Sequence, residues 1–191
     1  MNLPNKLTML RIILIPAFLV VYLAQPFSRE IILPFSLGSS TINEWLALFI
    51  FVVAAITDWL DGYLARKMEL ISSFGKLMDP LADKMLVCAA LVAFTATGEI
   101  GAWVAIVILC REFYISGFRQ LALEKNIVMA ADLLGKIKTV LQIVLIIFVL
   151  VPFINIPVLT FALSVLAVIF TIWSGVDYTW KNRKVLKGQK I

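Results

Sequence analysis

Six apolar stretches dominate the sequence, and each is long enough to cross a lipid bilayer. A membrane-spanning helix needs about 20 consecutive, mostly apolar residues. The predicted spans are Leu7–Ala24, Glu44–Leu64, Met78–Thr97, Gly101–Leu121, Leu133–Pro152 and Pro157–Trp180. They occupy most of the chain, so little remains for a separate soluble domain. The sequence therefore predicts an all-α fold, an integral membrane bundle of six transmembrane helices that forms one domain over residues 1–191.

The composition excludes several classes of protein. Apolar residues make up 62% of the chain and charged residues only 15%, whereas soluble domains are about 45–50% apolar and about 25% charged. A soluble enzyme, a disordered chain and a nucleic-acid partner are therefore excluded. The chain has no histidine, which excludes His-based triads and His metal sites. Cys88 and Cys110 lie in apolar stretches without metal-ligand spacing, and we expect them to be packing residues.

The distribution of basic residues predicts the orientation in the membrane. If the amino terminus is inside, only Arg29 of the 17 basic residues falls on the outer side. The positive-inside rule then places both termini in the cytoplasm of a multi-pass protein of the cell membrane. The first span resembles a signal peptide, but Val21–Gln25 is a poor cleavage site, so we expect a retained helix.

The second and third predicted spans contain four aspartates within a stretch of 26 positions: Asp58, Asp61, Asp79 and Asp83. The first two are three residues apart and the last two are four apart, so each pair shares a helix face. The apolar runs beyond each pair cover about 18 Å of a hydrocarbon core that is about 30 Å thick. We therefore expect both pairs near the cytoplasmic ends of neighbouring antiparallel helices, where they can converge.

Carboxylates at membrane depth are costly and point to function. Four converging carboxylates repel one another, and two divalent cations offset that repulsion. Because the ligand set is oxygen only, Mg²⁺ or Mn²⁺ is favoured over zinc. A two-metal site of this kind typically holds a phosphoryl group. In the alternative interpretation the aspartates cap their helices or form ion pairs with nearby bases, namely Arg66, Lys76 and Lys84.

A second set of charges predicts a site for an anionic group. Arg111 and Arg119 are eight residues apart, on roughly one helix face, and Lys136 begins the next apolar stretch. These three side chains suit a second anionic group, such as a phosphate, in addition to the one held at the predicted metal site. The alternative is that they extend to lipid head groups, which we expect for Lys138 in particular. Glu112 is expected to pair with a neighbouring base rather than to catalyse.

The aspartate region resembles a known family signature. From Asp58 to Asp83 the sequence reads Asp-x2-Asp-Gly-x2-Ala-Arg-x8-Gly-x3-Asp-x3-Asp. This pattern resembles the signature of the CDP-alcohol phosphotransferases, and all eight fixed positions are present. The segments Leu3–Arg11, Arg111–Arg119 and Gly135–Thr139 resemble the bacterial members of that family whose acceptor is glycerol-3-phosphate.

The resemblance implies a metal-dependent membrane transferase, usually a homodimer, with its active site open to the cytoplasm. It implies that Asp58, Asp61 and Asp79 bind the metals and that Asp83 binds them and acts as the general base. The residues implied to bind the cytidine nucleotide are Gly62, Ala65, Arg66 and Gly75. From their own spacing, Thr8 and Arg11 are expected to contact the donor phosphates.

The implied reaction transfers a phosphatidyl group from CDP-diacylglycerol to glycerol-3-phosphate, with release of CMP, in phospholipid biosynthesis. Within the same chemistry, the cardiolipin, phosphatidylserine and phosphatidylinositol-phosphate synthases are alternatives. A metal-ion transporter and a non-catalytic scaffold are the alternatives from other classes. Transport is less favoured because the outer halves of the predicted helices, past Glu44 at the outer edge of the second span, carry no charged residues that could relay an ion.

Overall fold

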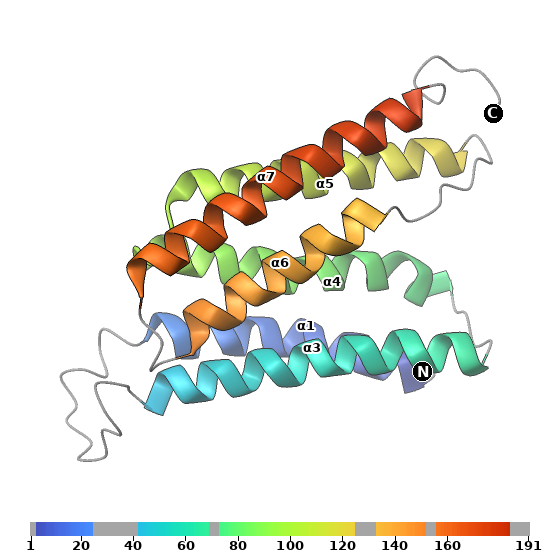
Figure 1. The fold of residues 1–191 in the computed structure, drawn as a ribbon. Helices are drawn as coiled ribbons and strands as arrows, with labels where there is room; N and C mark the ends of the chain where they lie inside the picture. Colours follow the sequence, from blue (N-terminus) through green and yellow to red (C-terminus); the bar gives the residue numbers. More distant parts are fainter. Residues whose placement is uncertain (1–2, 25–41, 69–72, 125–132, 152–155, 184–191) are drawn as a thin grey trace. The chain divides into compact units, whose positions relative to one another are not determined.

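The computed structural model describes residues 3–24, 42–68, 73–124, 133–151 and 156–183, and within those ranges the chain is helical and contains no strand (Figure 1). Its side chains are described over the narrower ranges 9–24, 42–57, 84–122, 133–151 and 156–183. The six helices are α1 (Leu3–Leu23), α3 (Ile42–Met68), α4 (Ser73–Ala96), α5 (Ala102–Glu124), α6 (Leu133–Leu150) and α7 (Pro157–Lys181). The all-α prediction is therefore confirmed, and each predicted span corresponds to one helix.

Two of the described helices, α6 and α7, are long and apolar enough to cross a membrane. The apolar parts of α1, α3 and α4 are shorter and cover Met9–Leu23, Ile42–Thr57 and Lys84–Ala96. Large apolar side chains are exposed on each described helix, for example Val20, Phe49, Val92, Phe113, Val144 and Phe161. Exposed apolar surface on this scale is typical of contact with lipid or with another protein.

The chain divides into two compact units. The first contains α1, α3, α4 and the end of α6, and the second contains α5, the rest of α6 and α7. Within the first unit, α1 packs against both α3 and α4, whereas α3 and α4 make few contacts with each other. In this unit α1 and α4 run in the same direction and α3 runs in the opposite direction (Figure 1). Helix α1 is therefore the shared neighbour of the two helices that carry the aspartates.

Aromatic rings join α1 to both of its neighbours. The Phe18 ring centroid lies 5.9 Å from that of Phe51 on α3. The Tyr22 ring meets Phe94 of α4 edge to face, with centroids 5.2 Å apart. These ring separations fall in the favourable range for aromatic pairs. The two contacts set the level of α1 relative to α3 and to α4.

Helix α4 ends in a tight turn at Thr97–Glu99. The Glu99 N–H donates to the Phe94 carbonyl oxygen at 2.9 Å, and the Gly98 N–H donates to the Thr95 carbonyl oxygen at 3.2 Å. Gly98 has φ of 80°, in the left-handed region that favours glycine. This pair of bonds is the Schellman arrangement, which satisfies carbonyl groups that the end of the helix leaves without partners.

In the second unit, α5 packs against α7 and the two helices run in the same direction (Figure 1). A buried cluster joins Ile115, Phe118 and Ala122 of α5 to Tyr178 of α7. The Phe118 and Tyr178 rings meet edge to face, with centroids 6.2 Å apart. Tyr178 is thus held rigidly between the two helices.

The packing of α1 on α3 predicts different effects for two phenylalanines of α3. Phe51 is 2% exposed and Phe49 is 65% exposed. Phe51→Ala removes a packed ring and leaves a cavity, so we expect it to lower the free energy of unfolding by about 3 kcal/mol. Phe49→Ala should change it by less than about 0.5 kcal/mol. Unfolding of the purified protein in mild detergent, titrated with SDS, measures both. Equal losses for the two variants would contradict the described packing.

Candidate functional site

The structure confirms the helical setting of the four aspartates. Asp58 and Asp61 lie within α3, and Asp79 and Asp83 lie within α4, so the predicted spacing of each pair along a helix face holds. Their side chains lie outside the part of the chain for which side chains are described. The same is true of the other predicted donor-site residues Thr8, Gly62, Ala65, Arg66 and Gly75. The metal site and the nucleotide site therefore remain predictions.

Arg11 is the one predicted donor-site residue whose side chain is described. It is 1% exposed and occupies the same face of α1 as Ile15, Phe18 and Tyr22, which are also buried. Burial of a guanidinium group is stable only when anionic or hydrogen-bonding groups surround it. Arg11 therefore faces the interior of the first unit and not lipid. The donor-phosphate contact expected for Arg11 stays a prediction.

Arg111, one of the three predicted phosphate ligands, bridges α5 and α7. Its Nη2 donates to Ser174 Oγ at 2.9 Å, and its Nη1 donates to Glu112 Oε1 at 3.4 Å. The Ser174 hydroxyl in turn donates to the Thr171 carbonyl oxygen at 3.2 Å. These contacts hold the guanidinium group against α7.

Glu112 forms a buried ion pair with Lys138 of α6. The two residues are 9% and 5% exposed. The prediction that Glu112 pairs with a base is confirmed, but the expectation that Lys138 reaches lipid head groups is wrong. The physical reason is the charge of Glu112, which offsets the cost of burying an ammonium group.

Lys136 lies on a different side of α6 from Lys138 and is exposed. Two residues along an α-helix correspond to a rotation of about 200°, so the two lysines point in different directions. The structure therefore brings Lys138, and not the predicted Lys136, to the cluster around Arg111 and Glu112. The sequence favoured Lys136 because it does not show which face of α6 meets α5.

Arg119, the third predicted phosphate ligand, also contacts α7. Its Nε donates to the Tyr178 hydroxyl oxygen at 3.1 Å, and its guanidinium carbon lies 5.4 Å from the centroid of the Tyr178 ring. The Arg119 side chain is at the surface, whereas Tyr178 is 3% exposed. Two different helical turns of α7 thus contact the two predicted arginines of α5.

The sequence did not single out the α7 residues that make these contacts. A signal is nevertheless present, because polar side chains recur on one face of an otherwise apolar helix. Thr171, Ser174 and Tyr178 follow one another at intervals of three and four residues and are all buried. Gln142 of α6 joins the same set, since its Nε2 donates to Thr171 Oγ1 at 3.3 Å.

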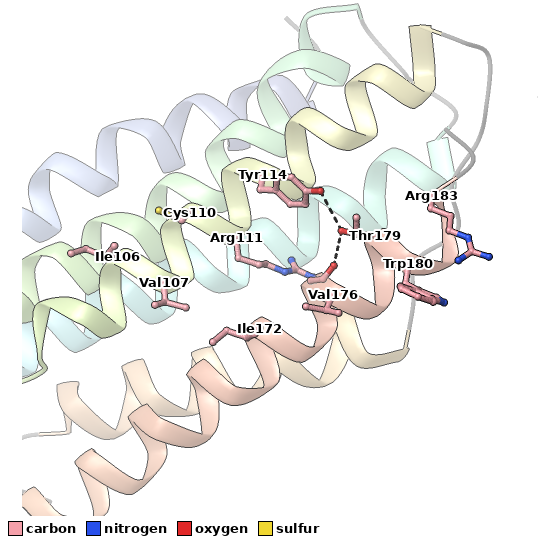
Figure 2. A pocket seen from close by; sticks show the side chains of 11 residues that line it. Ile106, Val107, Cys110, Arg111, Tyr114, Ile172, Val176, Thr179, Trp180 and Arg183 are labelled. Atoms are coloured by element: carbon pink, nitrogen blue, oxygen red, sulfur yellow. Dashed lines mark hydrogen bonds between the residues drawn. The ribbon is translucent and has the colours of Figure 1, made fainter. Parts of the chain in front are cut away.

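An apolar groove of about 780 Å³ runs beside this polar face between α5 and α7 (Figure 2). Its apolar walls include Ile106 and Val107 of α5 and Ile172 and Val176 of α7. Arg111 is one of its lining residues, and none of the described residues that line it is acidic. This groove lacks the carboxylates that the predicted chemistry requires, so it is not the predicted metal site.

The two cysteines are free thiols, and no disulfide joins them. Cys88 is partly buried, as expected of a packing residue, whereas Cys110 is exposed and lines the groove. The packing role expected for Cys110 is therefore wrong within the part of the chain that the structure describes.

The chain is similar to known proteins over nearly its whole length. The sequence profile of the CDP-alcohol phosphatidyltransferase family matches residues 1–173. A Bacillus subtilis protein named CDP-diacylglycerol–glycerol-3-phosphate 3-phosphatidyltransferase is 42% identical, with 97% of each chain covered. A protein of the same name from Shigella flexneri is 38% identical over 98% of each chain. A third, from Mycoplasma genitalium, is 40% identical over 75% of this chain and 62% of its own length.

The chain therefore belongs to the CDP-alcohol phosphatidyltransferase family. The resemblance found in the aspartate signature is confirmed. The similarity to the Bacillus and Shigella proteins covers nearly the whole length of each chain, so it includes α7, which carries no part of the signature.

The placement of the two lysines of α6 predicts unequal effects on stability. Lys138→Met removes the ammonium group from the buried carboxylate of Glu112, so we expect a loss of about 3 kcal/mol in the free energy of unfolding. Lys136→Met, at an exposed position, should cost less than about 0.5 kcal/mol. Denaturation of both variants in the same detergent provides the comparison. A larger loss for the Lys136 variant would show that the described orientation of α6 is wrong.

Proposed function

We propose that this protein transfers the phosphatidyl group of CDP-diacylglycerol to glycerol-3-phosphate, giving phosphatidylglycerophosphate and CMP. The observation that carries this proposal is the similarity over 97% of the chain to a protein named for that reaction. The eight-position aspartate signature supports the shared chemistry. The basic cluster around Arg111 and Arg119 supports an acceptor that carries its own phosphate.

The packing of α1 on α3 supports a donor site at the level of Arg11. Arg11 precedes Phe18 by seven residues, and Asp58 follows Phe51 by seven residues. The two helices are antiparallel (Figure 1), and the rings of Phe18 and Phe51 are in contact. Position 11 of α1 and position 58 of α3 therefore lie on the same side of that contact along the helix axes. Seven helical residues span about 10 Å. We therefore expect Asp58 and Arg11 at the same level.

The packing of α1 on α4 independently supports a position for Asp83 at the level of Arg11. Arg11 precedes Tyr22 by eleven residues, and Asp83 precedes Phe94 by eleven residues. These two helices run in the same direction (Figure 1), and the rings of Tyr22 and Phe94 are in contact. Eleven residues span about 16 Å. We expect Asp83 beside Arg11 too, so that the acidic pairs of α3 and α4 meet at one end of α1.

The helical register also supports this convergence. Ala47, Phe51 and Ala54 form the buried face of α3, and Asp58 and Asp61 continue the same series at intervals of four and three residues. On α4, Leu86, Ala90 and Phe94 are buried at intervals of four residues. Asp83, Asp79 and Gly75 extend that series toward the start of the helix. The helix faces of α3 and α4 that carry buried apolar residues at one end therefore carry aspartates at the other end.

The proposed cofactors are two divalent cations, Mg²⁺ or Mn²⁺. Four carboxylates on two neighbouring helices fit such ions, because both prefer oxygen ligands. Asp58, Asp61, Asp79 and Asp83 would hold them, and bound ions of this type supply charge neutralisation at the donor diphosphate. The buried guanidinium group of Arg11 adds a fixed positive charge on α1.

In the proposed mechanism the residues orient two substrates for a direct displacement at phosphorus. Asp83 accepts the proton of the acceptor hydroxyl while the oxygen of that hydroxyl bonds to the phosphorus next to diacylglycerol. The bond from that phosphorus to the oxygen of the CMP leaving group breaks. A carboxylate is a weak base, so orientation and electrostatic stabilisation supply most of the acceleration. Gly62, Ala65, Arg66 and Gly75 would bind the cytidine nucleotide, and Thr8 would join Arg11 at the donor phosphates.

The basic cluster of the second unit would bind the acceptor phosphate. Among the described side chains, Arg111, Arg119 and Lys138 contribute three positive charges and Glu112 one negative charge, which leaves a net charge of +2. This excess matches a phosphate monoester dianion. Arginine suits this role because its planar donors match phosphate oxygens. Lys136 stays a candidate ligand at the exposed edge of α6.

We further propose that all six helices cross the cell membrane, with both termini and the active site on the cytoplasmic side. The length and apolarity of α6 and α7 support this arrangement, as do the exposed apolar side chains on the other described helices. A lipid donor fits a membrane fold, since its acyl chains remain in the bilayer while its head group reaches the polar ends of the helices. Two chains are proposed to form a homodimer.

The choice of acceptor can be tested directly. Purified protein in detergent with Mg²⁺, CDP-diacylglycerol and a panel of acceptors should release CMP with glycerol-3-phosphate. The other acceptors in the panel are phosphatidylglycerol, serine and inositol phosphate, and they should give release at least about 100-fold slower, because they leave the basic cluster unpaired or do not fit it. Release with one of them and not with glycerol-3-phosphate would reassign the protein within its family.

The role of Asp83 predicts a selective loss. Asp83→Asn removes the proton acceptor but keeps the shape of the side chain, so turnover should fall by at least about 100-fold. Binding of CDP-diacylglycerol should be largely kept. Asp177→Asn is a matched control, because Asp177 pairs at the surface with Lys181 at 2.6 Å, and its turnover should stay within twofold of the parent. Near-normal turnover of the Asp83 variant would remove this residue from the role of base.

A further inference from the structure

We infer that helix α7 positions the two arginines of the acceptor-phosphate site, and that Tyr178 is its main positioning residue. This inference rests on the proposed function, in which Arg111 and Arg119 bind the phosphate of the acceptor. It assigns a role to α7, which carries no part of the family signature.

The contacts with α7 anchor two arginines of α5 that lie about two helical turns apart. Arg111 and Arg119 are eight residues apart, which separates their backbones by about 12 Å along the helix axis. Their partners Ser174 and Tyr178 are four residues apart, or about 6 Å along α7. The Arg111 bond to Ser174 is 2.9 Å and the Arg119 bond to Tyr178 is 3.1 Å. Two arginines that are about two turns apart on α5 are therefore anchored on adjacent turns of α7.

The two positive charges repel each other, so holding both at one site requires fixed partners. Among the described side chains, Arg119 forms no ion pair with a carboxylate, so its charge is not neutralised there. The Nε of Arg111 is buried and has no acceptor among the described residues. One cation without a described counter-ion and one donor without a described acceptor, both anchored on the same helix α7, are the features of a preformed anion site.

Tyr178 is suited to fix one of these groups. Its ring is 3% exposed and packs edge to face against Phe118, so its hydroxyl occupies a set position. That hydroxyl accepts the bond from Arg119 Nε, and the ring face lies 5.4 Å from the guanidinium carbon. Both contacts constrain the same guanidinium group.

Gly175 allows the other arginine to lie against α7. A Cβ atom at this position would stand 3.2 Å from Cγ of Arg111, which is closer than most side-chain contacts. The lack of a side chain at Gly175 thus leaves room for the aliphatic part of Arg111. Ser174, the preceding residue, then receives its guanidinium group.

The test compares steady-state kinetics of full-length variants in detergent. Tyr178→Phe keeps the packed ring and removes only the hydroxyl that accepts from Arg119. We expect the KM for glycerol-3-phosphate to rise about fivefold. The KM for CDP-diacylglycerol and the melting temperature should stay close to those of the parent, and kcat should change less than twofold. Arg119→Ala should raise the same KM further, and adding Tyr178→Phe to it should have no additional effect.

Tyr114→Phe is the matched control. Tyr114 also sits between α5 and α7, with its hydroxyl 3.5 Å from Thr179 Oγ1 (Figure 2), and no described bond joins it to either arginine. Its removal should leave the KM for glycerol-3-phosphate unchanged. Ser174→Ala should raise that KM, as Tyr178→Phe does, because it frees the guanidinium group of Arg111.

The outcomes separate this inference from the function on which it rests. If Arg119→Ala leaves the KM for glycerol-3-phosphate unchanged, the acceptor site itself is wrongly assigned. If Arg119→Ala raises it and Tyr178→Phe behaves like Tyr114→Phe, the site stands and the role of α7 is overturned. Equal effects of Tyr178→Phe on the KM of both substrates, or a lowered melting temperature, would mean that Tyr178 serves packing alone.

Discussion

Charged groups inside apolar helices need partners, and this requirement organises both units of the protein. In the first unit, Arg11 is 1% exposed on a helix whose other interior residues are apolar. In the second, Glu112 and Lys138 form an ion pair between α5 and α6. Burying such groups costs several kcal/mol each unless opposite charges or hydrogen bonds compensate. The few buried charged groups therefore lie on the helix faces that pack against other helices, beside a mainly apolar interior.

The helices of the first unit carry apolar residues toward one end and charged residues toward the other. Aromatic contacts of Phe18 with Phe51 and of Tyr22 with Phe94 hold the apolar part of the first unit together. Following these helices away from the contacts leads to Arg11 and to the aspartates of α3 and α4. Packing at one end can thus align functional groups at the other. This division suits an enzyme whose lipid substrate has acyl chains at one end and a charged head group at the other.

Much of the fold could be predicted from the sequence. The predicted span Pro157–Trp180 differs from α7 by one residue, because proline favours the first turn of a helix and apolar residues fill the rest. Helix α3 continues past the predicted end at Leu64 to Met68. The predicted span ends where the apolar run ends, whereas the backbone hydrogen bonds of the helix continue through the polar residues that follow.

The candidate site was predictable only in part. The pairing of Glu112 with a base follows from the rarity of unpaired acids at membrane depth. The choice between Lys136 and Lys138 depends on how α6 is rotated against α5, which no local pattern reveals. The roles of Ser174 and Tyr178 depend on contacts between residues about 60 positions apart. Local sequence rules do not report such contacts.

The proposed mechanism requires the aspartates of α3 and α4 to meet at one place and together to hold two metal ions. Crystals of the protein with Mn²⁺ and CMP, measured for anomalous scattering, test this requirement. We expect two manganese peaks per chain, roughly 4 Å apart, with oxygen atoms from both helices around them. A single ion, or peaks separated by more than about 8 Å with ligands from one helix each, would contradict it.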